Sequence, residues 1–263
     1  MDDHALAAEL ATAAGRLLLN LRSGSGLAGR ELKDAGDRES HEFLMAELGT
    51  ARPGDAVLSE EGKDDLARLD NDRVWIVDPL DGTREFGEPG RSDWAVHVAL
   101  WAGNRLAAGA VALPAQGMTL ATTEGGVNFS PPSWRTYEGK TIRLAVSRSR
   151  PPAFLTELAA FAAREGWTIE QVPIGSAGAK IAAVLQGQVD AYVHGGGQYE
   201  WDNAAPAAVA LAAGAHASRI DGSNLAYNQE HPELPDILVC HPTPAPVLLA
   251  GLHEAMTTPE RKS

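Results

Sequence analysis

Pairs of carboxylates stand at the ends of apolar stretches in this sequence. Asp78 and Asp81 follow the β-branched run of WIVDPLDGTREF, residues 75–86, and Glu60 and Glu61 follow AVLS. Crowded carboxylates raise one another's pKa, and burying them without a partner costs free energy. A divalent cation removes both penalties, so we expect the acids to converge on a metal site. The acids expected there are Asp37, Glu60, Asp78, Asp81 and Asp202 of EWDNAAP.

The ligand types favour a hard cation. Mg²⁺ prefers oxygen ligands in near-octahedral geometry and keeps several of its waters. The sequence has one cysteine and isolated histidines, none with the spacing of a zinc site. We therefore predict two or three Mg²⁺ ions, with Mn²⁺ as the alternative, and interpret the histidines as surface or packed residues.

The segment DPLDGT, residues 78–83, has the composition of a phosphate site. Pro79 is expected to end the strand, so that a turn brings both aspartates to one place. Gly82 lets the backbone approach a ligand, and Thr83 can cap a following helix whose N–H groups would receive a phosphate. The alternative is an Asp-Gly turn with threonine as a cap and no ligand.

The elements that must position these acids begin with helices in the first half. Leucine spacing predicts a helix over 3–22 and a second over 37–48. GSGLAG, 24–29, follows a helix, so it indicates a flexible loop rather than a dinucleotide cradle. Strands are expected at 56–60, 74–80, 92–101, 105–113 and 118–124, the last three as an antiparallel meander.

After a Pro-rich stretch, 129–141, the pattern changes to strands alternating with helices. This change predicts two subdomains, 1–140 with an antiparallel sheet and the metal site, and 141–263 with a mixed sheet, substrate specificity and Asp202. Interleaved apolar helices and strands indicate layered α/β packing rather than a bundle or barrel.

Composition limits the classes of partner. A net charge of −13, with 22 scattered Lys and Arg, disfavours nucleic-acid polymers and anionic membranes. The acidic N-terminus does not resemble a secretory signal, the apolar stretches are too short to span a bilayer, and the lone Cys240 suits a reducing compartment. We therefore expect a cytoplasmic protein. The Trp- and Ala-rich strands offer a face for a homodimer, although the sequence leaves the oligomeric state open.

Three segments in this order, LSEEG, WIVDPLDGTREF and EWDNAAP, resemble the signature segments of the inositol monophosphatase superfamily. The resemblance implies an αβαβα sandwich and a lithium-sensitive phosphatase that uses Mg²⁺. It also implies metal ligands at Glu60, Asp78, the Leu80 carbonyl, Asp81 and Asp202, with Asp37 at a weaker third site. Asp34 stands where the family has a threonine near that third site.

The same resemblance implies the reaction. Glu60 and Thr83 would orient and deprotonate the attacking water, and Asp37 would assist catalysis through the third metal. No covalent intermediate is required. The residues that would contact the substrate beside the metals are Asp81, Gly82, Thr83 and Asp202.

The substrate is less defined. VSRSR (146–150) and GSAGAK (175–180) resemble segments of the 3′-phosphoadenosine 5′-phosphate phosphatases of that superfamily, with Arg150 departing from a histidine. Arg148, Ser176 and Lys180 are the candidates for binding a second phosphate, and a surface or core-edge role is the alternative. His194 replaces the usual sugar-binding glutamate of the inositol enzymes, which disfavours inositol.

We therefore predict removal of the 3′-phosphate of 3′-phosphoadenosine 5′-phosphate to give AMP, in sulfate assimilation. The alternatives are inositol 1-phosphate and fructose 1,6-bisphosphate. A rival class, the haloacid-dehalogenase phosphatases, needs D-x-D-G-T, whereas the spacing here is D-x-x-D-G-T. A second rival, a metal-dependent binding protein without turnover, would need neither the base Glu60 nor the hydroxyl of Thr83.

Overall fold

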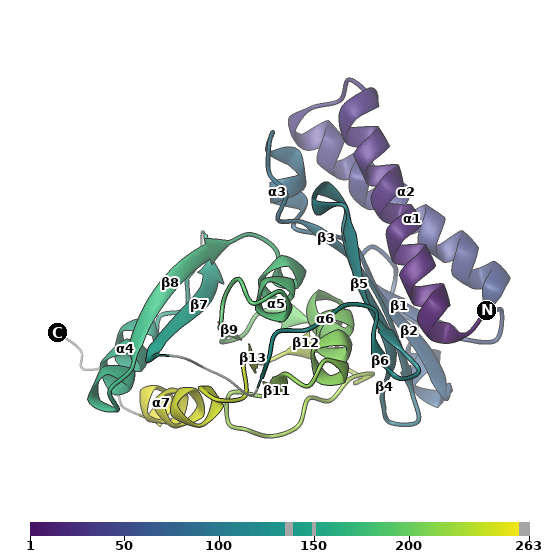
Figure 1. The fold of residues 1–263 in the computed structure, drawn as a ribbon. Helices are drawn as coiled ribbons and strands as arrows, with labels where there is room; N and C mark the ends of the chain where they lie inside the picture. The colour runs from purple at the N-terminus through teal and green to yellow at the C-terminus, as the bar shows by residue number, and fades with distance from the viewer. Residues whose placement is uncertain (135–138, 149–150, 258–263) are drawn as a thin grey trace.

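The computed structural model describes residues 1–134, 139–148 and 151–257. In this part of the chain, helices and sheets alternate in five layers that pack around three apolar cores, of which one contacts both sheets (Figure 1). The order is a helix pair, a six-stranded sheet, a second helix pair, a five-stranded sheet and a third helix pair. The predicted layered α/β fold is therefore confirmed.

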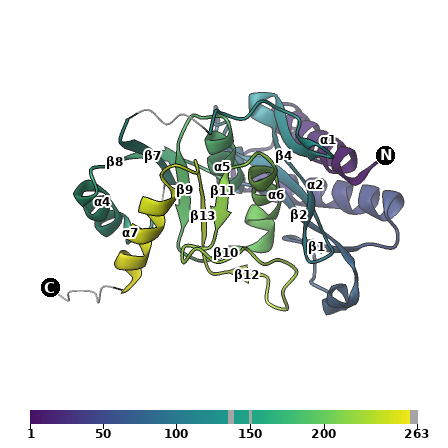
Figure 2. The ribbon, with the colours of Figure 1, turned by 60° about the horizontal axis from the view of Figure 1, so that its bottom comes forward.

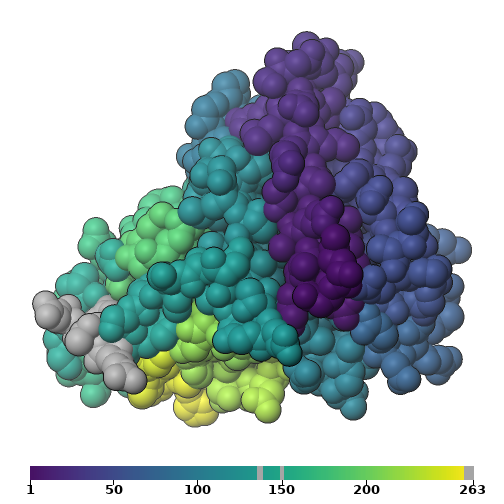
Figure 3. Space-filling view, turned by 45° about the vertical axis from the view of Figure 1, so that its right-hand side comes forward, coloured from purple at the N-terminus to yellow at the C-terminus, as the bar shows by residue number. Residues whose placement is uncertain are grey.

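The outer helix pair covers one face of the first sheet. α1 (Asp3–Gly24) is capped by Asp2, whose side chain accepts the Ala5 N–H, and it packs through a leucine and alanine face. In Figure 3 it lies on the surface beside α2 (Gly29–Ala51). The prediction that this second helix starts at residue 37 was wrong, because Leu32, Ala35 and Gly36 already pack inward. Gly24 ends α1 and Gly29 begins α2, so the loop predicted for GSGLAG is confirmed only for its four middle residues, 25–28.

The first sheet has the order β1-β2-β3-β4-β5-β6. Its pairs are antiparallel as predicted, except that β1 runs parallel to β2. The elements are β1 (Ala56–Ser59), β2 (Arg73–Asp81), β3 (Ala95–Ala102), β4 (Arg105–Leu113), β5 (Met118–Thr123) and β6 (Gly126–Val127). Short helices connect them: η1 (Leu66–Asp70), α3 (Thr83–Gly87) and η2 (Pro114–Gln116).

Alternation along β3 sends its side chains to two different cores. Val96 and Val98 pack under α1 and α2, whereas Ala95 and Ala99 face the middle helices. Successive residues of a strand point to opposite faces, so this is the period of two seen in the sequence. His97 lies on the second face, between Ala95 and Ala99, and is fully buried.

Strand β2 continues through Pro79 to Asp81, so the prediction that Pro79 ends it was wrong. Its pairing with β3 shifts between Asp78 and Asp81, which is a bulge or irregularity. Such an irregularity re-aims side chains near functional sites. The Pro79 carbonyl accepts a hydrogen bond of 2.7 Å from Ser40 Oγ of α2, which fixes the irregular segment to the helix.

The middle layer consists of α5 (Ala177–Leu185) and α6 (Glu200–Ala212), which lie between the two sheets (Figures 1 and 2). The second sheet is mixed, as predicted, with the order β11-β13-β9-β7-β8. Its strands are β7 (Thr141–Ser147), β8 (Thr168–Ile174), β9 (Ala191–His194), β11 (His216–Ser218) and β13 (Ile237–Cys240). A separate pair joins β10 (Gln198–Tyr199) to β12 (Glu233–Leu234), and α4 (Leu155–Arg164) and α7 (Ala245–Thr257) form the last layer.

The strands of the first sheet end before residue 128, and those of the second begin at 141. The middle helices follow residue 141 but share one apolar core with strands of both sheets. The division near residue 140 therefore stays a prediction. Within the described residues, no helix has both the length and the apolar character that a membrane span requires.

Candidate active site

Three carboxylates converge where β2 ends against the middle helices. Asp78, Asp81 and Asp202 each offer one oxygen, and these atoms all lie within 4.8 Å of one another. Asp78 and Asp81 are 1% and 6% exposed, and Asp202 is half-buried. Asp202 is 124 positions from Asp78 and 121 positions from Asp81 in the sequence, yet the three form one acidic cluster, as predicted.

Backbone N–H groups hold each of the three carboxylates. Asp78 Oδ1 accepts from Leu80 N at 3.0 Å, and Asp81 Oδ2 accepts from Gly178 N at 2.6 Å. Asp202 Oδ2 accepts from Tyr199 N at 2.6 Å. α6 begins at Glu200. Asp202 therefore lies in the first turn and caps it.

The negative charge of the three carboxylates is not balanced by neighbouring cationic side chains among the described residues. Burial raises the pKa of Asp78 well above its usual value, and the charges of Glu60 and Asp81 raise it further. Burial, then Asp81, raise the pKa of Asp202 to about 6. No Arg or Lys forms an ion pair with Asp78 or Asp202 in the part of the chain described. Buried oxygens that repel one another in this way fit a hard divalent cation.

Asp81 differs from its two neighbours. Burial raises its pKa, but the charge and hydrogen bonding of His97, helped by the Gly178 N–H, outweigh that effect and lower the pKa overall. His97 Nε2 lies 3.2 Å from Asp81 Oδ2. Burial lowers the pKa of His97, but Asp81 outweighs it and raises the pKa. Among the three acids of the cluster, Asp81 is thus the one within ion-pair distance of a side chain, His97, that is positively charged when it is protonated.

Glu60 lies at the open edge of the cluster, outside the three converging acids. Part of the Glu60 side chain is exposed to solvent. The protein atoms around its carboxyl group nevertheless disfavour the charged form, and this desolvation is the largest cause that raises its pKa to about 7, followed by the charge of Asp202. Asp37 of α2 has a pKa raised to about 6 by burial and then by Glu61. Both acids therefore change protonation state near neutral pH.

Thr83 connects Asp37 with the end of β2. Its Oγ1 lies 3.2 Å from Asp37 Oδ1 and 3.2 Å from the Leu80 carbonyl, and both are acceptors. The prediction that Thr83 caps α3 was wrong, because the helix is preceded by Gly82 without a side-chain cap. Gly82 has φ +86°, and a Cβ there would lie 2.8 Å from Ser176 Cβ, so the site needs glycine at this position.

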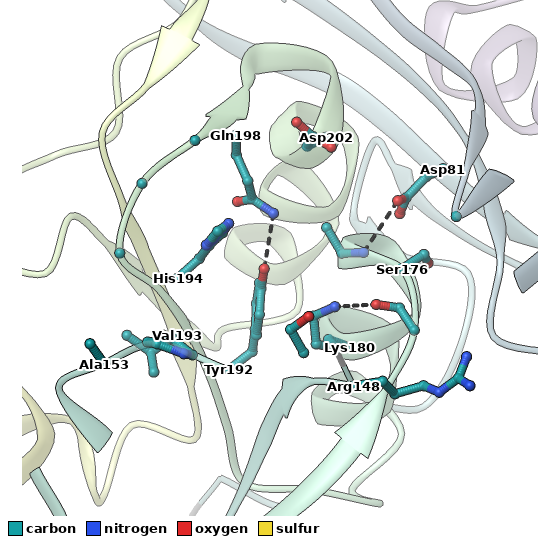
Figure 4. Close-up of a pocket in the computed structure, with 18 of the residues that line it drawn as sticks. Asp81, Arg148, Ala153, Ser176, Lys180, Tyr192, Val193, His194, Gln198 and Asp202 are labelled. Carbon is teal, nitrogen blue, oxygen red and sulfur yellow. Dashed lines mark hydrogen bonds between the residues drawn. The ribbon is translucent and has the colours of Figure 1, made fainter. Parts of the chain in front are cut away.

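A pocket of about 1450 Å³ opens beside the cluster. Figure 4 shows Asp81 and Asp202 at the top of the view, with Lys180 and Arg148 below them. All the residues predicted to contact the substrate line this pocket: Asp81, Gly82, Thr83, Arg148, Ser176, Lys180 and Asp202. Asp37, Glu60, Asp78 and Leu80 do not line it; Asp78 and Leu80 are buried at the end of β2.

The two candidate cations are held differently. Arg148 donates to Glu85 Oε1 at 2.7 Å and to Glu88 Oε2 at 3.1 Å. Lys180 is 5% exposed, donates to the Gly175 carbonyl and lies 5.2 Å from the centre of the Tyr192 ring. Burial lowers its pKa, against the opposing effect of Asp81. Ser176 caps α5, because its Oγ accepts from Ala179 N at 3.0 Å.

Sequence reasoning missed three residues of this site. His97 contacts Asp81, Glu85 contacts Arg148, and Tyr192 lies against Lys180. A signal existed for His97, because the alternation of β3 puts this one imidazole on the otherwise apolar face that meets the middle helices. His194 and the glycines of HGGG, 195–197, also line the pocket.

The sequence model of the inositol monophosphatase family matches residues 4–256, so the chain belongs to this family. It is a metal-dependent phosphatase and therefore a hydrolase. This excludes both rivals, the haloacid-dehalogenase phosphatase and the binding protein without turnover.

Among its relatives is the 3′-phosphoadenosine 5′-phosphate phosphatase of Mycobacterium bovis, 52% identical over 248 residues, which cover 92% of this chain and 90% of that protein. The 3′(2′),5′-bisphosphate nucleotidase CysQ of Escherichia coli is 32% identical over 200 residues, 73% of this chain and 78% of that one. The crystal structure of CysQ from Bacteroides thetaiotaomicron is 28% identical, with a TM-score of 0.75 over 90% of this chain and 96% of that chain.

Proposed function

We propose that this phosphatase uses Mg²⁺ to remove the 3′-phosphate of 3′-phosphoadenosine 5′-phosphate, which yields AMP and serves sulfate assimilation. The relative from Mycobacterium bovis supports the substrate, since it is 52% identical and carries the name of that substrate. The observation that carries the proposal is that two acids of the cluster, Asp81 and Asp202, line the same pocket as two cationic side chains, Arg148 and Lys180. A substrate with two phosphates would use both parts of it.

The residues that would hold the metals are Asp78, Asp81 and Asp202, joined by Glu60 and the Leu80 carbonyl, with Asp37 at a third site. Bound divalent ions would activate water and stabilise negative charge on the leaving oxygen. All these groups offer oxygen, and the raised pKa values of Asp78 and Asp202 reflect a shortage of positive charge. The donor set therefore suits Mg²⁺ and also admits Mn²⁺.

Glu60 and Thr83 would handle the proton of the attacking water. A general base works best when its pKa lies near the working pH, and the pKa of Glu60 is about 7. Thr83 Oγ1 has one hydrogen and two acceptors within 3.2 Å, Asp37 Oδ1 and the Leu80 carbonyl. When its hydrogen is donated to either acceptor, its lone pairs remain to accept from and orient a water.

The other end of the pocket would bind the second phosphate. Lys180 donates one hydrogen bond to the neutral Gly175 carbonyl and lies over the Tyr192 ring, so other N–H bonds of its ammonium group can turn toward a ligand. Arg148 would have to exchange Glu85 or Glu88 for the phosphate. Inositol 1-phosphate has no second phosphate that could replace the lost contact of Arg148 with Glu85 or Glu88. The pocket should therefore bind a bisphosphate better than inositol 1-phosphate.

The test is a phosphate-release assay on four substrates: 3′-phosphoadenosine 5′-phosphate, its 5′-phosphosulfate analogue, inositol 1-phosphate and fructose 1,6-bisphosphate. We expect the highest kcat/KM for one of the two adenosine substrates, loss of turnover in chelator, and inhibition by lithium. A higher kcat/KM for inositol 1-phosphate would contradict the proposed substrate and leave the phosphatase assignment intact. A homodimer and a cytoplasmic location remain predictions.

A further inference from the structure

His97 is a fully buried histidine between two parts of the metal site. It belongs to β3 and lies opposite Asp78 in the pairing of β2 with β3. Its Nδ1 lies 3.0 Å from the carbonyl of Trp201, the residue before Asp202. Its Nε2 lies 3.2 Å from Asp81 Oδ2, which is an ion-pair distance without hydrogen-bond alignment, and this buried nitrogen has no hydrogen-bond partner among the described residues. One ring thus bridges the end of β2 and the first turn of α6.

The two oxygens of Asp81 are used unequally. Oδ2 accepts from Gly178 N at 2.6 Å and also meets His97. Oδ1 receives only the longer contact of 3.3 Å from Ala177 N. A carboxylate oxygen has about two lone-pair sites. The donors therefore occupy Oδ2 and leave Oδ1 with capacity for a further ligand.

Gly178 makes this arrangement sterically possible. A Cβ on residue 178 would lie 2.0 Å from His97 Nε2 and 3.1 Å from Asp81 Oδ2. Atoms cannot approach that closely, so any larger residue would displace the imidazole from the carboxylate. The position of His97 thus explains why residue 178, the second glycine of GSAGAK, is a glycine.

We propose that His97 is a positioning residue of the metal site. By holding Asp81 through Oδ2, it presents Oδ1 to the cation, and through the Trp201 carbonyl it fixes how far Asp81 lies from Asp202. This inference rests on the proposed function, because it assumes that Asp81 and Asp202 hold the metal. Groups that orient metal ligands typically change metal affinity by about 10- to 100-fold when they are replaced.

Two amide variants separate the two contacts of the ring. In His97→Gln the side-chain nitrogen can occupy the place of Nε2 and still donate to Asp81. In His97→Asn it can occupy the place of Nδ1, so it donates only to Trp201. Calorimetric titration with Mg²⁺ alone, without substrate, should give a Kd for His97→Gln within about threefold of the wild type. For His97→Asn we expect a Kd weakened by about 10-fold or more.

A third variant covers the case in which His97→Asn does not fold. Gly178→Ala keeps the imidazole but pushes it away from Asp81, so it should weaken Mg²⁺ binding to a similar degree. Thermal unfolding in chelator serves as the folding control for all three variants. Equal Mg²⁺ affinity in the wild type, His97→Asn and Gly178→Ala would overturn the positioning role alone. A wild-type chain that takes up no Mg²⁺ would overturn the metal site and this inference together.

Discussion

At the acid end of the site, where the acidic cluster borders the pocket, Asp78 and Asp202 form no ion pair with Arg or Lys among the described residues, and burial with mutual repulsion raises their pKa values. At the other end, Arg148 is already paired with Glu85 and Glu88. The acid end therefore needs metal ions from solution to balance its charge. At the other end, the cationic side chain of Arg148 must give up a contact with Glu85 or Glu88 before it can bind a phosphate. Under the proposed function, the acid end binds the ions and the cationic end selects the substrate, so variants at the two ends should change different properties.

The largest effects are expected at the acid end. Both Asp78→Asn and Asp81→Asn should lower turnover at least 100-fold, since each removes a proposed metal ligand, and replacing even a supporting residue costs about 10- to 100-fold. Their effects on metal-free stability should have opposite signs. The raised pKa of Asp78 means that its charge destabilises the fold, whereas the lowered pKa of Asp81 means that its charge stabilises it.

Thermal unfolding in chelator at pH 8 measures this difference. Asp78→Asn should raise the free energy of unfolding, because it removes a charge that burial and the neighbouring Glu60 and Asp81 disfavour. Asp81→Asn should lower it, because the partner His97 and the Gly178 N–H lose a charged acceptor. Two shifts of the same sign would contradict the distinction between these aspartates.

A smaller and more selective effect is expected at the cationic end. Lys180→Met keeps the length of the side chain but removes its charge, so KM for 3′-phosphoadenosine 5′-phosphate should rise about 10-fold, as for loss of a hydrogen bond to a charged group. KM for inositol 1-phosphate should change less than threefold. Lys140→Met is the matched control, because Lys140 lies over the Trp167 ring outside the pocket. Equal changes for both substrates would count against a second-phosphate site.

The smallest effect concerns the stability of the metal-free chain as a function of pH. The pKa values of Asp37 and Asp202 are raised to about 6 and that of Glu60 to about 7. The folded chain therefore keeps protons that the unfolded chain has released above about pH 4. Stability should fall as the pH rises from about 4 to about 7, and saturating Mg²⁺ should remove this decline. Unfolding temperatures with and without Mg²⁺ would measure it, and identical pH curves would contradict it.

The sequence was sufficient to predict the layered fold and the acids that converge. Periodicity and the order of strands and helices report which faces are apolar, and these faces decide the layers. The start of α2 was missed because Leu32 and Ala35 lie within a charged segment. The strand continued past Pro79 because β2 accommodates a change in its pairing with β3 there.

Contacts between distant segments could not be read from the sequence. The pairs Arg148–Glu85 and His97–Asp81 depend on how α3 meets the loop after β7 and on how β3 aligns with β2. Composition and spacing indicate that such residues exist but not which of them meet. Site residues in signature segments were therefore predictable, whereas those that hold them in position were not.

The most direct test of the account is a calorimetric titration of the wild-type chain with Mg²⁺ at pH 6.5, repeated in two buffers of different ionisation enthalpy. Metal binds the deprotonated carboxylates. Since the pKa values of Glu60 and Asp202 are about 7 and about 6, uptake of Mg²⁺ should release protons, and the observed heat should depend on the buffer. No uptake of Mg²⁺, or uptake with the same heat in both buffers, would contradict the claim that these crowded acids form the metal site.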